Sequence, residues 1–298
     1  MTFSSQSQER KYVPMYNLAM RNLKLFFRDK SAVFFSLLAV FIIIGLYVLF
    51  LGDTIVGDMT EIKEARYLMD SWIMGGLLAV TSVTTTMGAF GTMVEDRANG
   101  NAKDFYASPL KRYQIAGGYV ISSFIVGLIM CAITFVLAEI YIVANGGELL
   151  PLLGMLKVIG LVFLSVLASS AMVFFLVSFF SSVNAFATGS TIIGTLIGFL
   201  TGIYIPIGNL PDAVQMIVKI FPVTHAGVLF RQVFMEEPLK ISFDGAPSTA
   251  INGFKEELGV VLSYGDYTAQ ASTHILVLIG VTLVFFALAV WNISRKKS

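Results

Sequence analysis

Charged residues are scarce in this sequence of 298 residues: they make up 13% of it, whereas 56% is hydrophobic. A soluble domain normally carries about a quarter charged residues, so the composition predicts an integral membrane protein. The net charge of +1 gives no indication of nucleic-acid binding. The single cysteine, Cys131, lies in an apolar run and cannot form an intrachain disulfide. We interpret it as a buried or lipid-facing side chain rather than a reactive thiol.

Motifs for catalysis and cofactor binding are also missing. The sequence contains no G-x-x-x-x-G-K-[ST] phosphate loop and no G-x-S-x-G nucleophile elbow. Its two histidines, His225 and His274, are far apart in the chain and lack the spacing of metal ligands. We therefore expect a chain that is not an enzyme by itself and binds no metal or cofactor.

Long apolar runs are what the sequence has instead. A helix needs about 20 apolar residues to cross a hydrocarbon core of about 30 Å. Six segments qualify and are predicted to span the membrane: 31–51, 71–94, 113–138, 158–180, 185–207 and 275–293. The expected fold is a single all-α transmembrane domain over residues 1–298. No cleavable signal peptide is expected, because the first apolar run follows about thirty more polar residues without an A-x-A-like site.

The distribution of lysine and arginine indicates the orientation. With both termini in the cytoplasm, the inside holds six basic residues before the first span, four between spans two and three, and three at the C-terminus. Only seven remain for the rest of the chain. The sequence therefore predicts a cell-membrane protein with both termini cytoplasmic.

Residues 15–30 precede the first span and have an amphipathic pattern. Arg21, Lys24 and Arg28 recur at helical spacing, and apolar residues such as Leu18 and Phe26 occupy the other side. This pattern favours a helix lying on the membrane surface over a plain basic flank.

The longest loop, residues 208–273, lies between spans five and six. Its first half contains two short apolar segments, 212–220 and 224–235, interrupted by prolines. Each segment is too short to span, so we expect short re-entrant helices at the outer side, followed by an exposed loop over 236–272. The residues singled out here are Pro206, Pro211, Pro222 and Arg231.

Ionisable residues inside the predicted spans are rare. Glu139, near the outer end of span three, is the main candidate for a proton-coupling role. It lies close enough to the interface to be hydrated, and we see no charge at a span midpoint. Ion-driven transport is therefore disfavoured.

The segment MVEDRANGNAKDFYASPLKRYQIAGGY, residues 93–119, joins spans two and three and is far longer and more charged than a simple turn requires. Residues 101–108 have a helical pattern that Pro109 ends. Lysine and arginine alone would serve to fix topology, so the acidic and aromatic residues need another explanation.

This charged segment, the six spans and the proline-interrupted outer segment together resemble the permease subunits of type-2 ABC exporters, over essentially the whole chain. The resemblance implies that the cytoplasmic segment, residues 95–112, contains a coupling helix that docks on a separate ATPase. The docking residues would be Glu95, Arg97, Lys103, Asp104, Phe105, Tyr106 and Pro109.

Two spans carry candidate residues for a pathway or a subunit contact. Span five has small residues four apart, which allow another helix to approach closely; packing within the subunit is an equal alternative. Span two is rich in hydroxyls, and the resemblance implies that spans two and five line the substrate path. The residues are Thr81, Thr84, Thr85, Ser190, Gly194, Gly198 and Gly202.

The sequence thus favours the membrane subunit of an ATP-driven exporter for an amphipathic cargo such as a drug, peptide or lipid-like molecule. Its expected partners are membrane lipid, two copies of an ATPase that holds ATP and magnesium, and a second permease in a homo- or heterodimer. The alternatives are a non-transporting sensor or immunity subunit that binds an extracellular peptide, and an ion-coupled carrier.

Overall fold

The structure is a computed structural model that describes residues 3–51, 57, 59 and 62–295. Regular structure in this part of the chain is helical except for one two-residue β-ladder, as the apolar runs predict. The elements in chain order are α1 (Phe3–Arg28), α2 (Lys30–Ser36), α3 (Leu38–Leu46), η1 (Tyr47–Leu51), α5 (Ala65–Ala98), α6 (Asn101–Ala107), α7 (Arg112–Ala144), α8 (Leu152–Val177), α9 (Val183–Leu200), η2 (Ile207–Asn209), α10 (Asp212–Ile220), α11 (Pro222–Phe234), α12 (Glu236–Ser242), α13 (Ser248–Glu257), β1 (Ser263–Tyr264), β2 (Tyr267–Thr268) and α14 (Ala271–Arg295).

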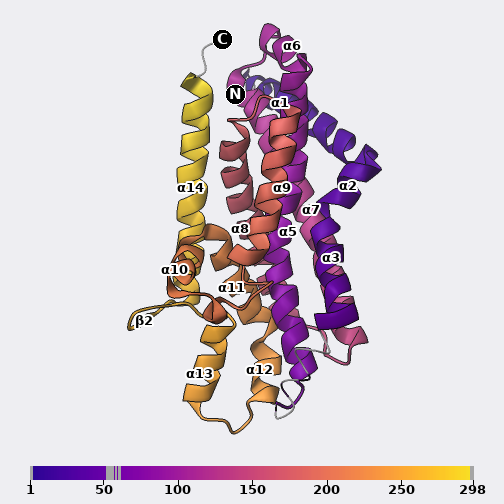
Figure 1. Cartoon of the computed structure of the whole chain (residues 1–298). Helices are drawn as coiled ribbons and strands as arrows, with labels where there is room; N and C mark the ends of the chain where they lie inside the picture. The colour runs from indigo at the N-terminus through magenta and orange to yellow at the C-terminus, as the bar shows by residue number, and fades with distance from the viewer. Residues whose placement is uncertain (1–2, 52–56, 58, 60–61, 296–298) are drawn as a thin grey trace.

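The long helices run roughly along one direction and give the molecule two ends (Figure 1). Helix α6 and the C-terminal end of α14 lie at one end, where α1 is also found, and this is called the α6 end. Helices α12 and α13 lie at the opposite end, called the α13 end.

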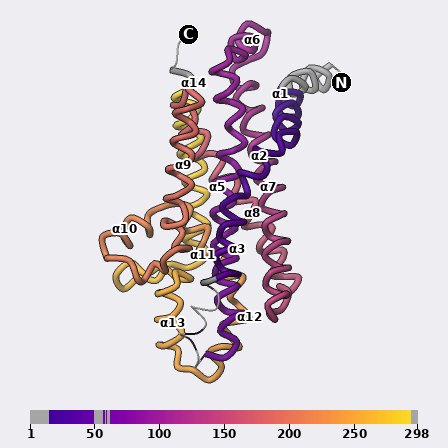
Figure 2. The backbone as a smooth tube through the Cα atoms, turned by 45° about the vertical axis from the view of Figure 1, so that its right-hand side comes forward, coloured from indigo at the N-terminus to yellow at the C-terminus, as the bar shows by residue number. Residues whose placement is uncertain are grey.

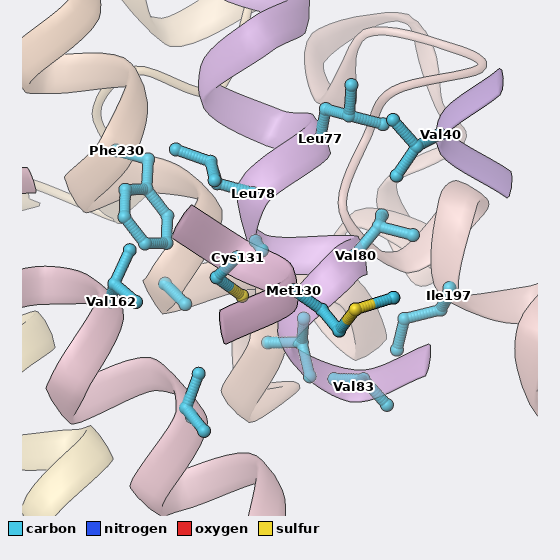
Figure 3. Close-up of a cluster of buried hydrophobic side chains, with 14 of the residues drawn as sticks. Val40, Leu77, Leu78, Val80, Val83, Met130, Cys131, Val162, Ile197 and Phe230 are labelled. Atoms are coloured by element: carbon cyan, nitrogen blue, oxygen red, sulfur yellow. The ribbon is translucent and has the colours of Figure 1, made fainter. Parts of the chain in front are cut away.

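Helix α5 is the central element of the bundle (Figure 2). Its 34 residues, at a rise of about 1.5 Å each, give a length of about 50 Å, which exceeds the hydrocarbon core. It packs against α7, α8, α9 and α11. Figure 3 shows part of this core, where Leu77, Val80 and Val83 of α5 share one cluster with Val40 of α3 and Ile197 of α9. Cys131 is fully buried in the same cluster.

Five described helices are long and apolar enough to cross a membrane: α5, α7, α8, α9 and α14. Two bent helix pairs raise this number to as many as seven if each pair is one span. The first pair, α2 with α3, bends by 45° at Leu37 within the predicted first span. The second pair, α10 with α11, bends by 85°. Every predicted span therefore overlaps a helix or a bent helix pair.

Helix α9 ends earlier than the predicted span 185–207. Gly202 adopts a positive φ of 69° directly after the helix, a conformation that suits glycine because it has no Cβ. The amides of Gly202 and Ile203 donate to the carbonyls of Phe199 and Gly198, at 3.0 Å each. This is a Schellman ending, which satisfies the last carbonyls and turns the chain.

The segment 236–272 is more structured than the exposed loop predicted there. It contains α12, α13 and the β1–β2 hairpin. The indole of Trp72 on α5 donates to the carbonyl of Leu258 at 2.7 Å and fixes the end of α13 to the bundle. The two short apolar helices are present as α10 and α11, but α11 is buried along most of its length.

Helix α5 begins at Ala65, before the predicted charge-free span 71–94, and so contains an ion pair. The Arg66 Nε lies 3.1 Å from the Asp70 Oδ2 one turn along. Helix α1 is also longer than the predicted 15–30, and it packs on α7 and α5 rather than standing alone. Its apolar face, with Leu18 and Phe26, is buried against the bundle.

Candidate functional site

A groove runs along one side of α5. It has a volume of about 650 Å³ and lies between α2, α3, α5 and α9. Its walls are mostly apolar, with hydroxyls at intervals. The residues that line it are Ala32, Phe35, Ser36, Leu38, Ala39, Ile42, Val83, Thr84, Met87, Gly88, Phe186, Ser190, Thr191, Ile193, Gly194, Thr195 and Tyr204.

The groove continues towards the α6 end into a second cavity of about 290 Å³. Ala32 and Gly88 line both cavities. The second cavity adds charged residues, among them Arg28, Asp29 and Glu95. The combined groove is thus apolar along the helices and charged at its α6 end.

Three of the seven residues predicted for a pathway or seam line this groove: Thr84, Ser190 and Gly194. A Cβ added to Gly194 would meet no other atom within 4 Å, so this glycine faces open space. The Ser190 hydroxyl is buried and has no hydrogen-bond partner among the described residues.

The other four residues lie elsewhere. Thr81 and Thr85 are fully buried inside the bundle, and their hydroxyls donate to carbonyls of α5 itself, at 2.8 Å and 2.7 Å. Gly198 is covered by the ring of Tyr204, which leaves no room for an added Cβ. Gly202 lies beyond the end of α9. The sequence predicted that Ser190, Gly194, Gly198 and Gly202 share one helical face. This prediction is wrong, because α9 ends before Gly202.

Sequence reasoning missed a stripe of polar residues on the exposed side of α9. Asn184, Thr188, Thr191 and Thr195 are all exposed, at spacings that keep them on one helical face. Each threonine hydroxyl donates to the carbonyl four residues earlier, at 2.9–3.0 Å. The spacing was visible in the sequence, but only the structure shows that no other helix in the described part of the chain covers it.

The proline-bounded segment forms the bent helix pair of α10 and α11. Pro206 precedes η2, Pro211 precedes α10, and Pro222 is the first residue of α11. Proline suits these positions because the first helical N–H groups have no intrahelical partner. The corner between α10 and α11 is therefore encoded locally.

Arg231 on α11 is completely buried. Its guanidinium lies over the ring of Trp72, with Cζ 4.8 Å from the ring centroid, and Nε donates to the Trp72 carbonyl at 3.4 Å. Neither Nη1 nor Nη2 has a hydrogen-bond partner among the described residues. A buried guanidinium without an anion is costly, and aromatic and carbonyl contacts offset this in part.

Helix α6 stands at the tip of the α5–α7 hairpin, where the sequence predicted a helix over 101–108. Gly100 precedes it with a φ of 84°, and Pro109 follows its extended C-cap residue Ser108. None of its side chains is buried. A seven-residue helix without a buried face is not stable by itself, so neighbouring helices must position it.

The predicted docking residues divide into two groups. Glu95, Lys103, Asp104, Tyr106 and Pro109 are exposed at or near this tip. Phe105 is half-buried and lies under the guanidinium of Arg21 on α1.

Arg97 also points inward, contrary to its predicted place on the surface. Its Nη1 donates to the carbonyls of Val177 and Phe180, at 3.1 Å and 3.2 Å. These carbonyls belong to the C-terminal end of α8 and the turn after it, where unpaired acceptors and the helix dipole favour a cation. Arg97 therefore closes the end of α8.

Glu139 has a structural partner. Its Oε2 accepts a hydrogen bond from the amide of Leu150 at 3.0 Å, which ties the loop between α7 and α8 to α7. Its Oε1 is buried without a partner among the described residues.

The two histidines, distant in the sequence, meet in the structure. His225 on α11 and His274 on α14 are buried, with their Nδ1 atoms 2.7 Å apart. Only one of these nitrogens can donate to the other. In the described part of the chain no third histidine, cysteine or carboxylate joins them to form a metal-binding group. The pair thus links α11 to α14.

Comparison with known protein families identifies the class of protein that this fold and groove define. The family model described as ABC-2 family transporter protein matches residues 57–291. The match covers the bundle from the start of α5 to near the end of α14. The chain therefore belongs to the ABC-2 family and is a multi-pass membrane permease of an ABC transporter. No curated protein matches the sequence.

Membership of this family implies association with an ABC ATPase. The family is one of transporter membrane subunits, which are generally not catalytic themselves. The resemblance to type-2 ABC permeases, drawn from the charged segment and the proline-interrupted segment, is confirmed.

Proposed function

We propose that this chain is the membrane subunit of an ATP-driven exporter that works with a separate ATPase. Helix α6 is the coupling helix and docks on that ATPase. The observation that carries the proposal is that α6 projects at one end of the bundle with no buried side chain of its own. Its exposed surface combines Lys103, Asp104 and Tyr106, which suits an interface where charges set register and an aromatic ring anchors.

In this proposal the chain crosses the cell membrane six times. The bent pair of α2 and α3 is the first span, and the pair of α10 and α11 is re-entrant. Helices α10 and α11 have 9 and 13 residues. At the usual rise they are about 14 and 20 Å long, and each is too short to cross the membrane alone. An even number of spans agrees with α1, α6 and the end of α14 lying at the same end. The basic residues place that end in the cytoplasm.

The exposed polar face of α9 is proposed to face a second permease subunit across the groove. A row of threonines, whose hydroxyls are satisfied by their own helix, allows a second helix with small and hydroxyl residues to pack closely against it. A seam there would enclose the groove from the side that this chain leaves open.

The cargo is proposed to be amphipathic. The groove is apolar along α3, α5 and α9 and charged at the α6 end, near Arg28, Asp29 and Glu95. A molecule with an apolar body and a polar end fits such walls, whereas a hydrated sugar would leave its hydroxyls without partners.

Recovery of a co-expressed ABC ATPase on the purified permease tests the docking proposal. We expect the double substitution Asp104→Lys and Tyr106→Ala to reduce recovery about tenfold or more, because losing an interface anchor commonly costs about 2 kcal/mol. A matched control replaces Asp266 by Lys and Tyr267 by Ala. Tyr106 and Tyr267 are 53% and 54% exposed, and strand β2, which begins with Tyr267, lies far from α6 (Figure 1). Equal recovery by both variants would contradict the docking proposal.

A further inference from the structure

The carboxylate of Asp96 is the most fully bonded buried charge at the α6 end. Asp96 lies in the last turn of α5 and is 3% exposed. Arg21 binds it through both terminal nitrogens, at 2.7 Å and 2.8 Å. Tyr119 donates to it at 2.6 Å and Asn101 at 3.0 Å. A carboxylate has about four acceptor positions, so these four bonds use its whole capacity.

The four donors come from three different helices. Arg21 belongs to α1, Asn101 to α6 and Tyr119 to α7, while Asp96 itself belongs to α5. Charge-assisted bonds of this length, in bidentate geometry, are among the strongest side-chain contacts. The hydrogen bonds to Asp96 also raise the pKa of the Arg21 guanidinium above its usual value. The carboxylate is therefore the point where four helices meet.

The position of α6 depends on the bonds to Asp96 more than the positions of the long helices do. It has no buried side chain, and its first residue, Asn101, is bonded to Asp96. Farther along the helix, the Phe105 ring lies 5.3 Å from Arg21 Cζ. Both contacts run through the Arg21–Asp96 pair, so the pair fixes where α6 lies relative to α1.

Helix α1 leads directly to the wall of the groove. It ends at Arg28, and the next residue, Asp29, caps α2 by accepting from the amides of Ser31 and Ala32 at 2.9 Å and 3.0 Å. Helix α2 then supplies groove residues, among them Ala32 and Ser36. A displacement of α1 is thus passed to the groove through a well-capped junction.

We infer that Asp96 is a positioning residue that makes α1 follow α6, so that movement of the coupling helix reaches the α2–α3 wall of the groove. The inference rests on the proposed function, because it assigns α6 to ATPase docking. Without the carboxylate, α6 would still present its exposed face to the ATPase but would move independently of α1. The role differs from simple stabilisation, since it concerns which helices move together.

A second ion pair on the same helix provides a matched control. Arg66 and Asp70 form a guanidinium–carboxylate pair at the other end of α5, and Asp70 is completely buried. If the effect of losing Asp96 were general destabilisation of α5, Asp70→Asn would reproduce it. If Asp96 acts by positioning α6 against α1, Asp70→Asn would not.

The test measures distances between helices in the permease–ATPase complex, in nanodiscs of phosphatidylethanolamine and phosphatidylglycerol. Spin labels replace Tyr16 on α1, Ala107 on α6 and Val290 on α14, two at a time, with Cys131 changed to Ala. All three label positions are exposed. Distances are recorded without nucleotide and with ATP and vanadate. Tyr119→Phe, which removes one hydrogen bond and keeps the ring, serves as a milder second variant.

In the protein with Asp96 intact, we expect ATP and vanadate to shift the 107–290 and 16–290 distances together and to leave 16–107 unchanged. In Asp96→Asn the 107–290 shift should persist while the 16–290 shift is lost, and Tyr119→Phe should lose part of it. Asp70→Asn should behave like the unmodified chain. A 16–290 shift that persists in Asp96→Asn, or that Asp70→Asn also abolishes, would overturn the inference. Failure of the ATPase to co-purify with the unmodified chain would instead overturn the proposed function, and it is seen before any distance is measured.

Discussion

Helices α5 and α9 both carry several threonines, yet the two helices differ in what covers them. Thr81 and Thr85 of α5 are fully buried among α7, α8 and α11. Thr188, Thr191 and Thr195 of α9 are exposed. In both helices the hydroxyls donate to the backbone one turn earlier, so threonine satisfies its own polar group in either place. Residue type therefore shows that a hydroxyl is tolerated in the membrane, and only the surrounding helices show whether it is available to a partner.

The largest expected difference between the two helices concerns the stability of the subunit. Leu77 of α5 is fully buried, whereas Leu196 of α9 is 50% exposed. We expect Leu77→Ala to lower the free energy of unfolding by about 2–5 kcal/mol, because it leaves a cavity. Leu196→Ala should change it by only about 0.5 kcal/mol. Unfolding of the purified protein in detergent measures both, and equal losses would show that α9 is as much a core helix as α5.

A second comparison lies within α9 itself. Gly198 is covered by Tyr204, whereas Gly194 faces open space. Gly198→Leu should therefore destabilise the single subunit by about 1–3 kcal/mol through overpacking. Gly194→Leu should leave the stability of the subunit unchanged and interfere with whatever occupies the groove. Thermal unfolding separates the two, and a stability loss in Gly194→Leu as large as in Gly198→Leu would contradict the open groove.

A smaller effect distinguishes hydroxyls that join helices from those that bond only their own helix. Ser82 of α5 lies 3.0 Å from the hydroxyl of Ser169 and accepts from Ser165 at 2.8 Å, both on α8. Hydrogen bonds between membrane helices contribute about 0.6 kcal/mol on average, so Ser82→Ala should cost about 1 kcal/mol with its lost contacts. Thr85→Val should cost less, since its hydroxyl bonds only α5. Reversal of this order in unfolding measurements would contradict the assignment.

The smallest expected effect is a pH dependence at the α13 end. The hydrogen bond from Lys157 at 3.0 Å holds the pKa of Glu236 below its usual value. A carboxyl whose pKa is lowered by folding adds stability that is present at neutral pH and lost as the pH falls through that lowered pKa. Both side chains are largely exposed, so the contribution is about 0.5 kcal/mol or less. Glu236→Gln should lower the melting temperature slightly at pH 7 and not at pH 3, and an equal shift at both would contradict the ion pair.

Features determined by local sequence were predictable. The apolar runs located the membrane helices, and Pro109 correctly marked the end of α6. Proline at 211 and 222 likewise marked the starts of α10 and α11. In each case neighbouring residues in the chain decide the outcome, through apolar length or the fixed φ of proline.

Features that depend on distant contacts were not predictable. Arg21 and Asp96 are 75 residues apart, and His225 and His274 are 49 apart. No periodicity connects such residues, so their pairing follows only from how the helices pack. The inward turn of Arg97 has the same cause, since its acceptors lie at the end of α8. The early end of α9 was partly predictable. Glycine commonly follows the end of a helix, as Gly202 does here, but the apolar run continues past it.

The central claim is that α5 holds the subunit together while α9 faces a second subunit, and cysteine cross-linking in native membranes tests it most directly. Thr191→Cys on α9 and Leu283→Cys on α14 are compared in a Cys131→Ala background. Both positions are exposed and lie near the middle of their helices. Oxidation is predicted to produce a disulfide-linked dimer with Thr191→Cys and none with Leu283→Cys. A dimer formed through Leu283→Cys and absent with Thr191→Cys would contradict the account.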